Sequence, residues 1–597
     1  FTLGQTLGYT HQKSVGLGNT NSEFGGPLSS AINLDPTTPV VETDPTLANG
    51  APYNSNPVIR DANGNPYGIS SLVGQEMTNP KAYLLTRLGG YNWSDDIIGN
   101  AFLEVVVNKH IKLKSSVGGK LAYWGGQGFT PVFYLSPTVS VQKNNYGKGI
   151  NNTFNWNIEN TLTYSRTMGS HDFSILFGQG AYVENNGGGS SVTLFDLPIS
   201  NYQDASFNFD IPQANRTSGS YDFTNHKLTS IFSRLNYNYK EKYLFTGIIR
   251  RDGSSRFGLN NKYGTFPSFS LGWIASKEDF WSINQYVKYL KIRAGYGKVG
   301  SDNVGDFGYL SRVAGGFNYT LGNAGAITTG YSPTSLDNPD LKWEQTSQAN
   351  FGLDAQLFQN FTLTMEVFKK KTSGILRPVP IPGYVGVSES PLANIANMEN
   401  SGFEFELGYQ KKFGQFTFSA NANMATLKNK VTYVNSDTNY IQGEAGFQSM
   451  GPVTRTKVGE SYNSFFGYQT AGIFQNMAEV AAYTNKAGGL IQPNARPGDF
   501  RWVDTDGDGE ITGKDKTFLG SNLPKLTFGI TVNVGYKGFD LMVFGQGAMG
   551  NKIFQGLRRL DIINANYQTK ALSRWTGEGT SNDYPRLTND DVNGNFG

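Results

Sequence analysis

Hydrophobic and polar residues alternate one by one along many segments of this chain. The clearest example is residues 526–546, which read LTFGITVNVGY-KG-FDLMVFGQ. One face of its first arm carries Leu526, Phe528, Ile530, Val532, Val534 and Tyr536, and the positions between them are Thr, Gly or Asn. Because successive side chains of a strand point to opposite faces, this arm predicts a strand with one apolar face and one small, polar face. Lys537-Gly538 predicts a tight turn into a second strand.

The same hairpin pattern recurs at residues 102–117, 235–249, 351–367 and 403–424, each time around a short polar turn. Between the hairpins run long excursions, at residues 13–95, 186–225, 301–340, 434–523 and from 551 onward. Short turns on one rim and long loops on the other are typical of outer-membrane β-barrels, whose turns are periplasmic and whose loops are extracellular. Tyr and Phe residues gather beside the short turns, where an interfacial aromatic girdle is expected.

Composition agrees with a large β-structure. The 597 residues include 73 Gly, 32 Tyr and 40 Phe, and only 16% are charged. The net charge of +3 and the lack of a basic run argue against nucleic acid as a partner. The absence of cysteine excludes disulfides and thiolate chemistry. Alternation alone would also suit a soluble sandwich, but the unequal loops favour a barrel in outer-membrane lipid.

Several segments, in order, resemble one known family. They are RRDGSSRFGLNNKYGTFPSFSLGW (250–273), LKIRAGYGKVGS (290–301), NPDLKWEQT (338–346), ENSGFEFELGY (399–409), GYQTAGIFQN (467–476), PGDFRWVDTDGDGEIT (497–512) and GNKIF (550–554). Together they resemble the barrel of SusC/RagA-type TonB-dependent outer-membrane transporters. The resemblance implies an all-β, transmembrane antiparallel barrel of about 22 strands around an N-terminal plug. We expect about fifteen of those strands here, so that residues 1–597 form an incomplete barrel without the plug and the last strands.

The resemblance also implies a function, namely active import of oligosaccharides or peptides across the outer membrane. Energy would come from TonB through the absent N-terminal region, and a SusD-like surface lipoprotein would cover the barrel. A passive porin-type channel and a secreted β-rich adhesin are the alternatives. No nucleophile elbow, phosphate loop or H-E-x-x-H motif appears, and the four histidines (His11, His110, His171 and His226) share no metal-ligand spacing. The sequence therefore predicts no enzyme.

Residues 497–523 are predicted to form an Asp/Gly-rich extracellular loop within the barrel. Residues 504–515 fit a twelve-residue calcium loop in which Asp504, Asp506 and Asp508 hold positions one, three and five. Glu510 would offer its carbonyl at position seven, and Asp515 stands at position twelve, where Glu is usual. These oxygen ligands suggest a structural Ca²⁺. The alternative is a loop rich in Asx-turns that folds without metal.

Substrate contacts are expected from aromatic and amide side chains of the loops and lumen. The aromatic candidates are Trp124, Tyr319, Tyr331, Phe447, Tyr462, Phe465 and Phe466, and ordinary loop packing is the alternative for each. Glu404 and Glu406 are expected on the lumen face. Residues 250–256, RRDGSSR, are predicted to form a tight connection in which Arg and Asp pair, and a role in substrate binding is the alternative.

Overall fold

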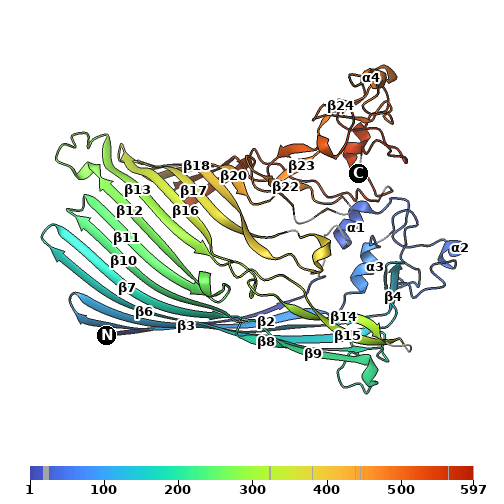
Figure 1. The fold of residues 1–597 in the computed structure, drawn as a ribbon, viewed down its shortest axis with the longest axis horizontal. Helices are drawn as coiled ribbons and strands as arrows, with labels where there is room; N and C mark the ends of the chain where they lie inside the picture. Colours follow the sequence, from blue (N-terminus) through green and yellow to red (C-terminus); the bar gives the residue numbers. More distant parts are fainter. Residues whose placement is uncertain are drawn as a thin grey trace.

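The computed structural model describes residues 1–17, 26–74, 76–321, 325–379, 381–436, 438–443, 446–447, 450–562 and 564–595. Its main element is an antiparallel sheet of 18 strands (Figure 1). Three of these, β8 (Gly187–Phe195), β9 (Arg216–Asp222) and β20 (Lys428–Val434), extend neighbouring strands. The other fifteen follow one another in a single ladder that forms the wall.

In ladder order, the wall strands are β1 (Thr2–Ser14), β2 (Tyr91–Asn108), β3 (Ile111–Thr130), β6 (Asn145–Met168), β7 (His171–Glu184), β10 (His226–Tyr239), β11 (Tyr243–Ser254), β12 (Tyr263–Ile274), β13 (Val287–Ser301), β16 (Glu344–Leu357), β17 (Phe361–Pro378), β18 (Leu392–Phe413), β19 (Phe416–Thr426), β27 (Leu526–Tyr536) and β28 (Phe539–Met549). Within the described residues, β1 and β28 each pair on one side only, so the wall is an open, curved sheet. Its number of strands agrees with the expectation from the sequence.

The two rims of the wall differ, as the sequence predicts. Turns of two or three residues join β2 to β3, β6 to β7, β10 to β11, β16 to β17, β18 to β19 and β27 to β28. At Lys537-Gly538 both residues have positive φ, 49° and 88°, as the type I′ hairpin turn requires. The long loops gather at the opposite rim (Figure 1).

The two faces of the wall also differ. Val532 lies between Ala420 and Val543 on the neighbouring strands, and Ile530 on the same face is 50% exposed. On the other face Asn533 donates to Ser419 at 3.3 Å. Outer-membrane barrels turn an apolar band to lipid and a polar face to the lumen. The alternating pattern therefore assigns the apolar face to lipid, in agreement with the prediction.

The long loops contain small elements of their own. The helices are α1 (Pro27–Asn33), α2 (Pro45–Ala48), α3 (Pro80–Leu85) and α4 (Met477–Ala482), with 3-10 turns η1 (Gln213–Asn215), η2 (Leu259–Asn261), η3 (Ala275–Lys277), η4 (Gly383–Val385), η5 (Gly513–Asp515) and η6 (Thr569–Ser573). The loop strands are β4 (Phe133–Ser136), β5 (Val139–Val141), β14 (Val313–Leu321), β15 (Ala326–Pro333), β21 (Tyr440–Gln442), β22 (Thr454–Lys457), β23 (Ser464–Gly467), β24 (Thr470–Ile473), β25 (Phe500–Trp502) and β26 (Thr517–Gly520). Among the described helices, none combines the length and apolarity needed to cross a bilayer.

Contacts between distant loops organise the long-loop rim. Helix α1 lies beside the C-terminal segment, and the backbone N–H of Arg559 donates to Asn33 Oδ1 at 2.7 Å (Figure 1). The Arg559 side chain is buried and binds Asp561 at 2.6 Å and Glu76 at 3.2 Å. The first and last long loops are therefore joined by a buried ion-pair cluster.

Candidate functional site

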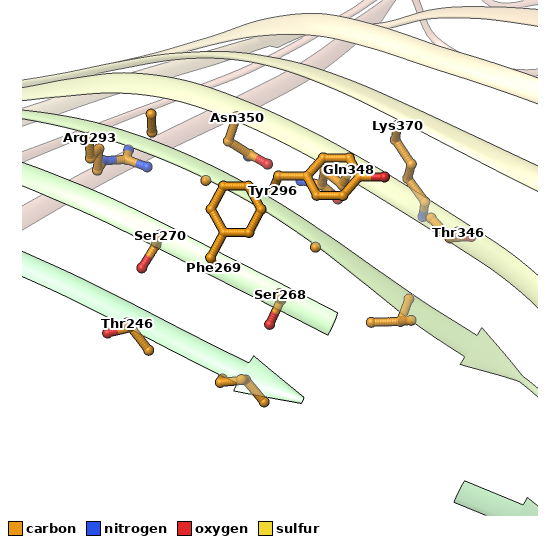
Figure 2. A pocket seen from close by; sticks show the side chains of 15 residues that line it. Thr246, Ser268, Phe269, Ser270, Arg293, Tyr296, Thr346, Gln348, Asn350 and Lys370 are labelled. Atoms are coloured by element: carbon orange, nitrogen blue, oxygen red, sulfur yellow. The ribbon is translucent and has the colours of Figure 1, made fainter. Parts of the chain in front are cut away.

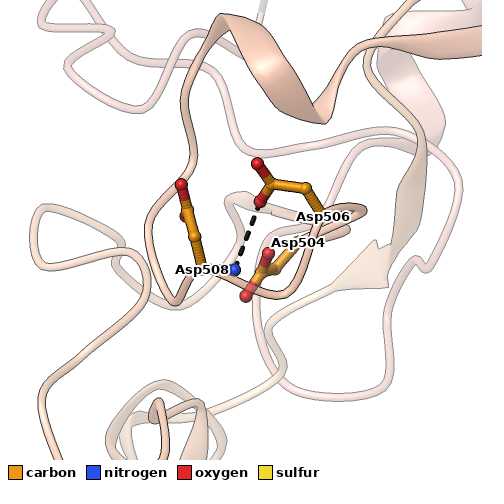
Figure 3. A group of neighbouring side chains, drawn as sticks. All are labelled: Asp504, Asp506 and Asp508. Carbon is orange, nitrogen blue, oxygen red and sulfur yellow. Dashed lines mark hydrogen bonds between the residues drawn. The ribbon is translucent and has the colours of Figure 1, made fainter.

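The predicted calcium loop brings three of its carboxylates together. Between β25 and β26, one oxygen each of Asp504, Asp506 and Asp508 lies within 4.8 Å of the others (Figure 3). Asp504 accepts the N–H groups of Gly507 at 2.7 Å and Gly509 at 2.9 Å. These bonds bend the loop tightly, and Asp506 in turn accepts the N–H of Asp508 at 3.2 Å. The arrangement presents a cluster of hard oxygen atoms suited to a divalent cation.

The two remaining predicted ligands are placed differently. Asp515 is fully buried, and its two oxygens accept the N–H groups of Thr505 and Thr512, each at 2.7 Å. Burial alone would raise the pKa of Asp515, but the donors Thr512 and Thr505 hold that pKa below its usual range. Asp515 thus ties the two ends of the loop together. Among the described residues, the side chains of Glu510 and Asp515 are not part of the three-carboxylate cluster.

The lumen face carries ion pairs and hydrogen bonds between charged and amide side chains. Arg293 on β13 binds Asp354 at 3.3 Å and pairs with Glu366 on β17. Further along the same face, Glu406 accepts from Asn421 at 2.8 Å. Glu404 is the cross-strand neighbour of Glu366, so it shares this face, as expected for a polar lumen.

A hollow of about 460 Å³ opens in this face where the wall carries glycine (Figure 2). Gly295 and Gly297 add no side chain there, and their cross-strand neighbours Asn350 and Gln348 border the space. Lys370 also lines it, and no carboxylate of the described residues lies within ion-pair distance of its amino group. The hollow therefore combines one unpaired ammonium group with amides, hydroxyls and apolar side chains such as Ile248 and Val299.

The seven aromatic candidates do not converge on one site. Three of them pack within the loops, because Phe447 contacts Phe554 at 5.0 Å, Phe465 contacts the same ring at 6.5 Å and Phe466 contacts Phe518 at 5.2 Å between centroids. Tyr462 lies against the guanidinium of Arg377. Tyr319 and Tyr331 are exposed on the β14–β15 hairpin, and Trp124 lies on the wall strand β3.

One feature of the rim contradicts the sequence prediction, and a second feature was not predicted. Residues 250–254 continue strand β11 and do not form a tight turn, although Arg250 does bind Asp252 at 2.8 Å. His226 is buried between Glu184 at 3.2 Å and Asp302 at 2.7 Å. Neither partner is near His226 in sequence, so only the pairing of β7 with β10 and the path of the loop after β13 could reveal the cluster.

Comparisons with known proteins agree with this architecture. Residues 24–595 match the model of the family described as TonB dependent receptor-like, beta-barrel. TonB-dependent receptor P3 of Formosa agariphila is 32% identical over 73% of this chain and 43% of its own length. TonB-dependent receptor SusC of Bacteroides thetaiotaomicron is 28% identical over 90% of this chain and 51% of its own length. The chain thus spans about half the length of the curated relatives that it matches.

Among solved structures, the RagAB peptide transporter has a TM-score of 0.72 with 20% identity. The match covers 88% of this chain and 56% of that one. At this level of identity the likeness concerns the fold.

Proposed function

Because the chain belongs to the TonB-dependent receptor β-barrel family of the outer membrane, we propose that it forms the wall of an active importer of the SusC/RagA type. The family match across residues 24–595 is the observation that carries the proposal. The apolar outer face and the one-sided long loops support it, because a substrate arriving from outside meets the loops first. A secreted adhesin has no support in this family, whereas a passive channel is the alternative to test.

The proposed cargo is an oligosaccharide or a peptide. A relative named SusC and a structural neighbour titled a peptide transporter support these two classes. We further propose that TonB supplies the energy and that a SusD-like surface lipoprotein covers the long-loop rim. The chain would then act by binding and conformational gating, without covalent chemistry.

Uptake by cells that carry the full-length protein tests the proposal. Fluorescent oligosaccharides and peptides would be offered to the parent strain, a strain lacking the gene and a strain lacking TonB. We expect one class to accumulate in the parent strain alone and to stop when a protonophore collapses the proton gradient. Uptake that persists without the gradient would indicate a passive channel. Detergent extraction at neutral pH should also recover a surface lipoprotein bound to the barrel.

We also propose that Asp504, Asp506 and Asp508 hold a structural Ca²⁺, with Glu510 and Asp515 completing the loop. The convergence of three carboxylates supports this proposal. Lys514, at 3.5 Å from Asp508, offsets part of the negative charge. Terbium luminescence of the purified protein tests it. The signal should fall with Asp506→Asn and should compete with calcium, and an absence of terbium binding would refute the site.

A further inference from the structure

A second hollow lies on the lumen face near the long-loop rim. It measures about 630 Å³ and is lined by side chains from β1, β2, β3 and β6. We call it the Trp124 groove, and its defining residues are Gln12, Ser14, Asn92, Ser94, Trp124 and Asn151. Ser94, Trp124 and Asn151 are direct cross-strand neighbours, so they point to the same face. That face is the lumen face, because it also carries the ion pair of Asp96 and Lys120.

Glycine makes the groove deep. Gly126, Gly128, Gly147 and Gly149 form its floor beside Trp124 and add no side chain. A Cβ on Gly126 would lie 2.3 Å from Asn92 Oδ1, so a larger residue there would displace the amide. The wall therefore keeps an open space next to an indole ring.

The groove continues into a neighbouring hollow of about 700 Å³, with which it shares Asn151. The rings of Trp124 and Phe223 lie 5.9 Å apart at an angle of 6°. Phe223 in turn contacts Tyr221, whose hydroxyl donates to Asn151 Oδ1 at 2.7 Å. Aromatic surface thus extends over a length that exceeds a single ring.

The Trp124 groove carries no net charge. None of its six defining residues is charged, and the nearby Asp96 and Lys120 neutralise each other at 3.0 Å. Within the described part of the chain, the side-chain amides of Gln12 and Asn92 have no hydrogen-bond partner in the protein. Free amides both donate and accept, and an aromatic face offers apolar contact. A sugar ring presents the matching groups, hydroxyls at its edge and C–H bonds on its face.

A peptide fits this groove less well. In one common mode, an extended peptide adds to a free strand edge. The strands that carry Asn92, Trp124 and Asn151 offer no such edge, because β2, β3 and β6 are each paired on both sides, although β1 pairs on one side only among the described residues. The groove also lacks a charged group for a peptide terminus or an acidic side chain. The hollow at Lys370, by contrast, has an unpaired positive charge among the described residues. The two hollows therefore suit different ligands.

We propose that the Trp124 groove binds a neutral oligosaccharide, with one sugar ring against Trp124 and hydroxyls on Gln12, Asn92 and Asn151. The proposal rests on the import function and names its substrate class. It gives the wall itself a binding site on the path from the long loops into the lumen.

Calorimetry on the full-length protein in detergent tests this inference. The probes are maltohexaose, xylohexaose, mannohexaose and cellohexaose, with hexagalacturonate and a mixture of octapeptides for comparison. At least one neutral hexasaccharide should bind, and Trp124→Ala should weaken that binding about tenfold or more. Trp156→Ala is the matched control, because Trp156 pairs with Gly119 on the opposite face of the same strands. Heat-modifiable migration verifies that each variant is folded.

Three results would overturn the proposal: no neutral hexasaccharide binds, Trp124→Ala binds like the parent, or the acidic sugar or peptides bind more tightly. The uptake assay separates this failure from failure of the import function. If uptake depends on the proton gradient but Trp124→Ala binds the sugar as tightly as the parent does, the sugar site in the groove is refuted and the import function stands. If sugar binding depends on Trp124 but uptake continues without the proton gradient, active import is refuted and the sugar site in the groove stands.

Discussion

An arginine at residue 532 should destabilise the folded protein far more than an arginine at residue 531. Val532 faces outward between Ala420 and Val543, whereas Thr531 faces the lumen beside Asn421. Val532 stands five residues before Lys537, at the end of the strand. With about 3.3 Å per residue and a strand tilt of about 40°, it lies about 13 Å above the turn. That is near the middle of an apolar band about 25 Å tall.

At that depth Val532→Arg should cost about 2–4 kcal/mol, which lowers the ratio of folded to unfolded protein by about 30- to 900-fold. Thr531→Arg should cost less than about 1 kcal/mol, because its guanidinium enters the polar lumen. The full-length protein would be refolded into lipid vesicles over a urea series, with the folded fraction read from heat-modifiable migration. Equal effects, or a larger effect for Thr531→Arg, would refute the assignment of faces.

Three further predictions concern the long loops. Asp515→Asn should leave one buried backbone N–H without a good acceptor, which should lower the stability of the loop by about 1–3 kcal/mol. Proteolysis within residues 503–516 should therefore be faster in this variant. In the control variant Asp506→Asn, cleavage measured without metal should be unchanged. Burial alone would raise the pKa of Asp35, but hydroxyls of Ser70 and two threonines lower that pKa to about 2. The ionised carboxylate therefore stabilises its loop above pH of about 4, and this stabilisation is lost as the pH falls towards 2. Hydrogen exchange in the loop should become faster over that pH range. In Ser70→Ala, exchange should become faster at a higher pH than in the parent. Arg559→Ala leaves Glu76 and Asp561 without their buried cationic partner, so it should lower the stability of the folded rim by about 3–5 kcal/mol. Protease should then cleave the segment 551–595 more readily. Cleavage equal to that of the parent would contradict the role of this cluster.

The wall was predictable because its signal is local. The alternation from Leu526 to Tyr536 and the turn at Lys537-Gly538 specify a hairpin without reference to the rest of the chain. The contrast between short turns and long loops likewise needs only spacing along the sequence. At residues 250–254 the local signal is wrong, because Gly and Ser favour a turn, whereas pairing with β10 and β12 holds this segment in strand β11.

The sites were predictable only in part. Asp504, Asp506 and Asp508 converge as expected, because a twelve-residue motif contains them all. The burial of Asp515 depends on how the loop packs, and spacing does not determine that. Trp124 is a candidate from its residue type, but its uncharged neighbours come from three other strands. His226 gains both carboxylate partners from distant segments.

By itself, the sequence determined that this protein is a two-faced β-wall with short turns at one rim and long loops at the other. Side-chain alternation and turn chemistry act over a few residues, so these properties can be read directly from the chain. The tertiary structure alone decided which polar groups meet on the lumen face and which loops are joined at the rim. Strand register and loop packing bring together residues such as Asn33 and Arg559, or Gln12 and Asn151, whose distance in sequence leaves no local pattern. A binding site made of such pairs exists only once the wall has folded.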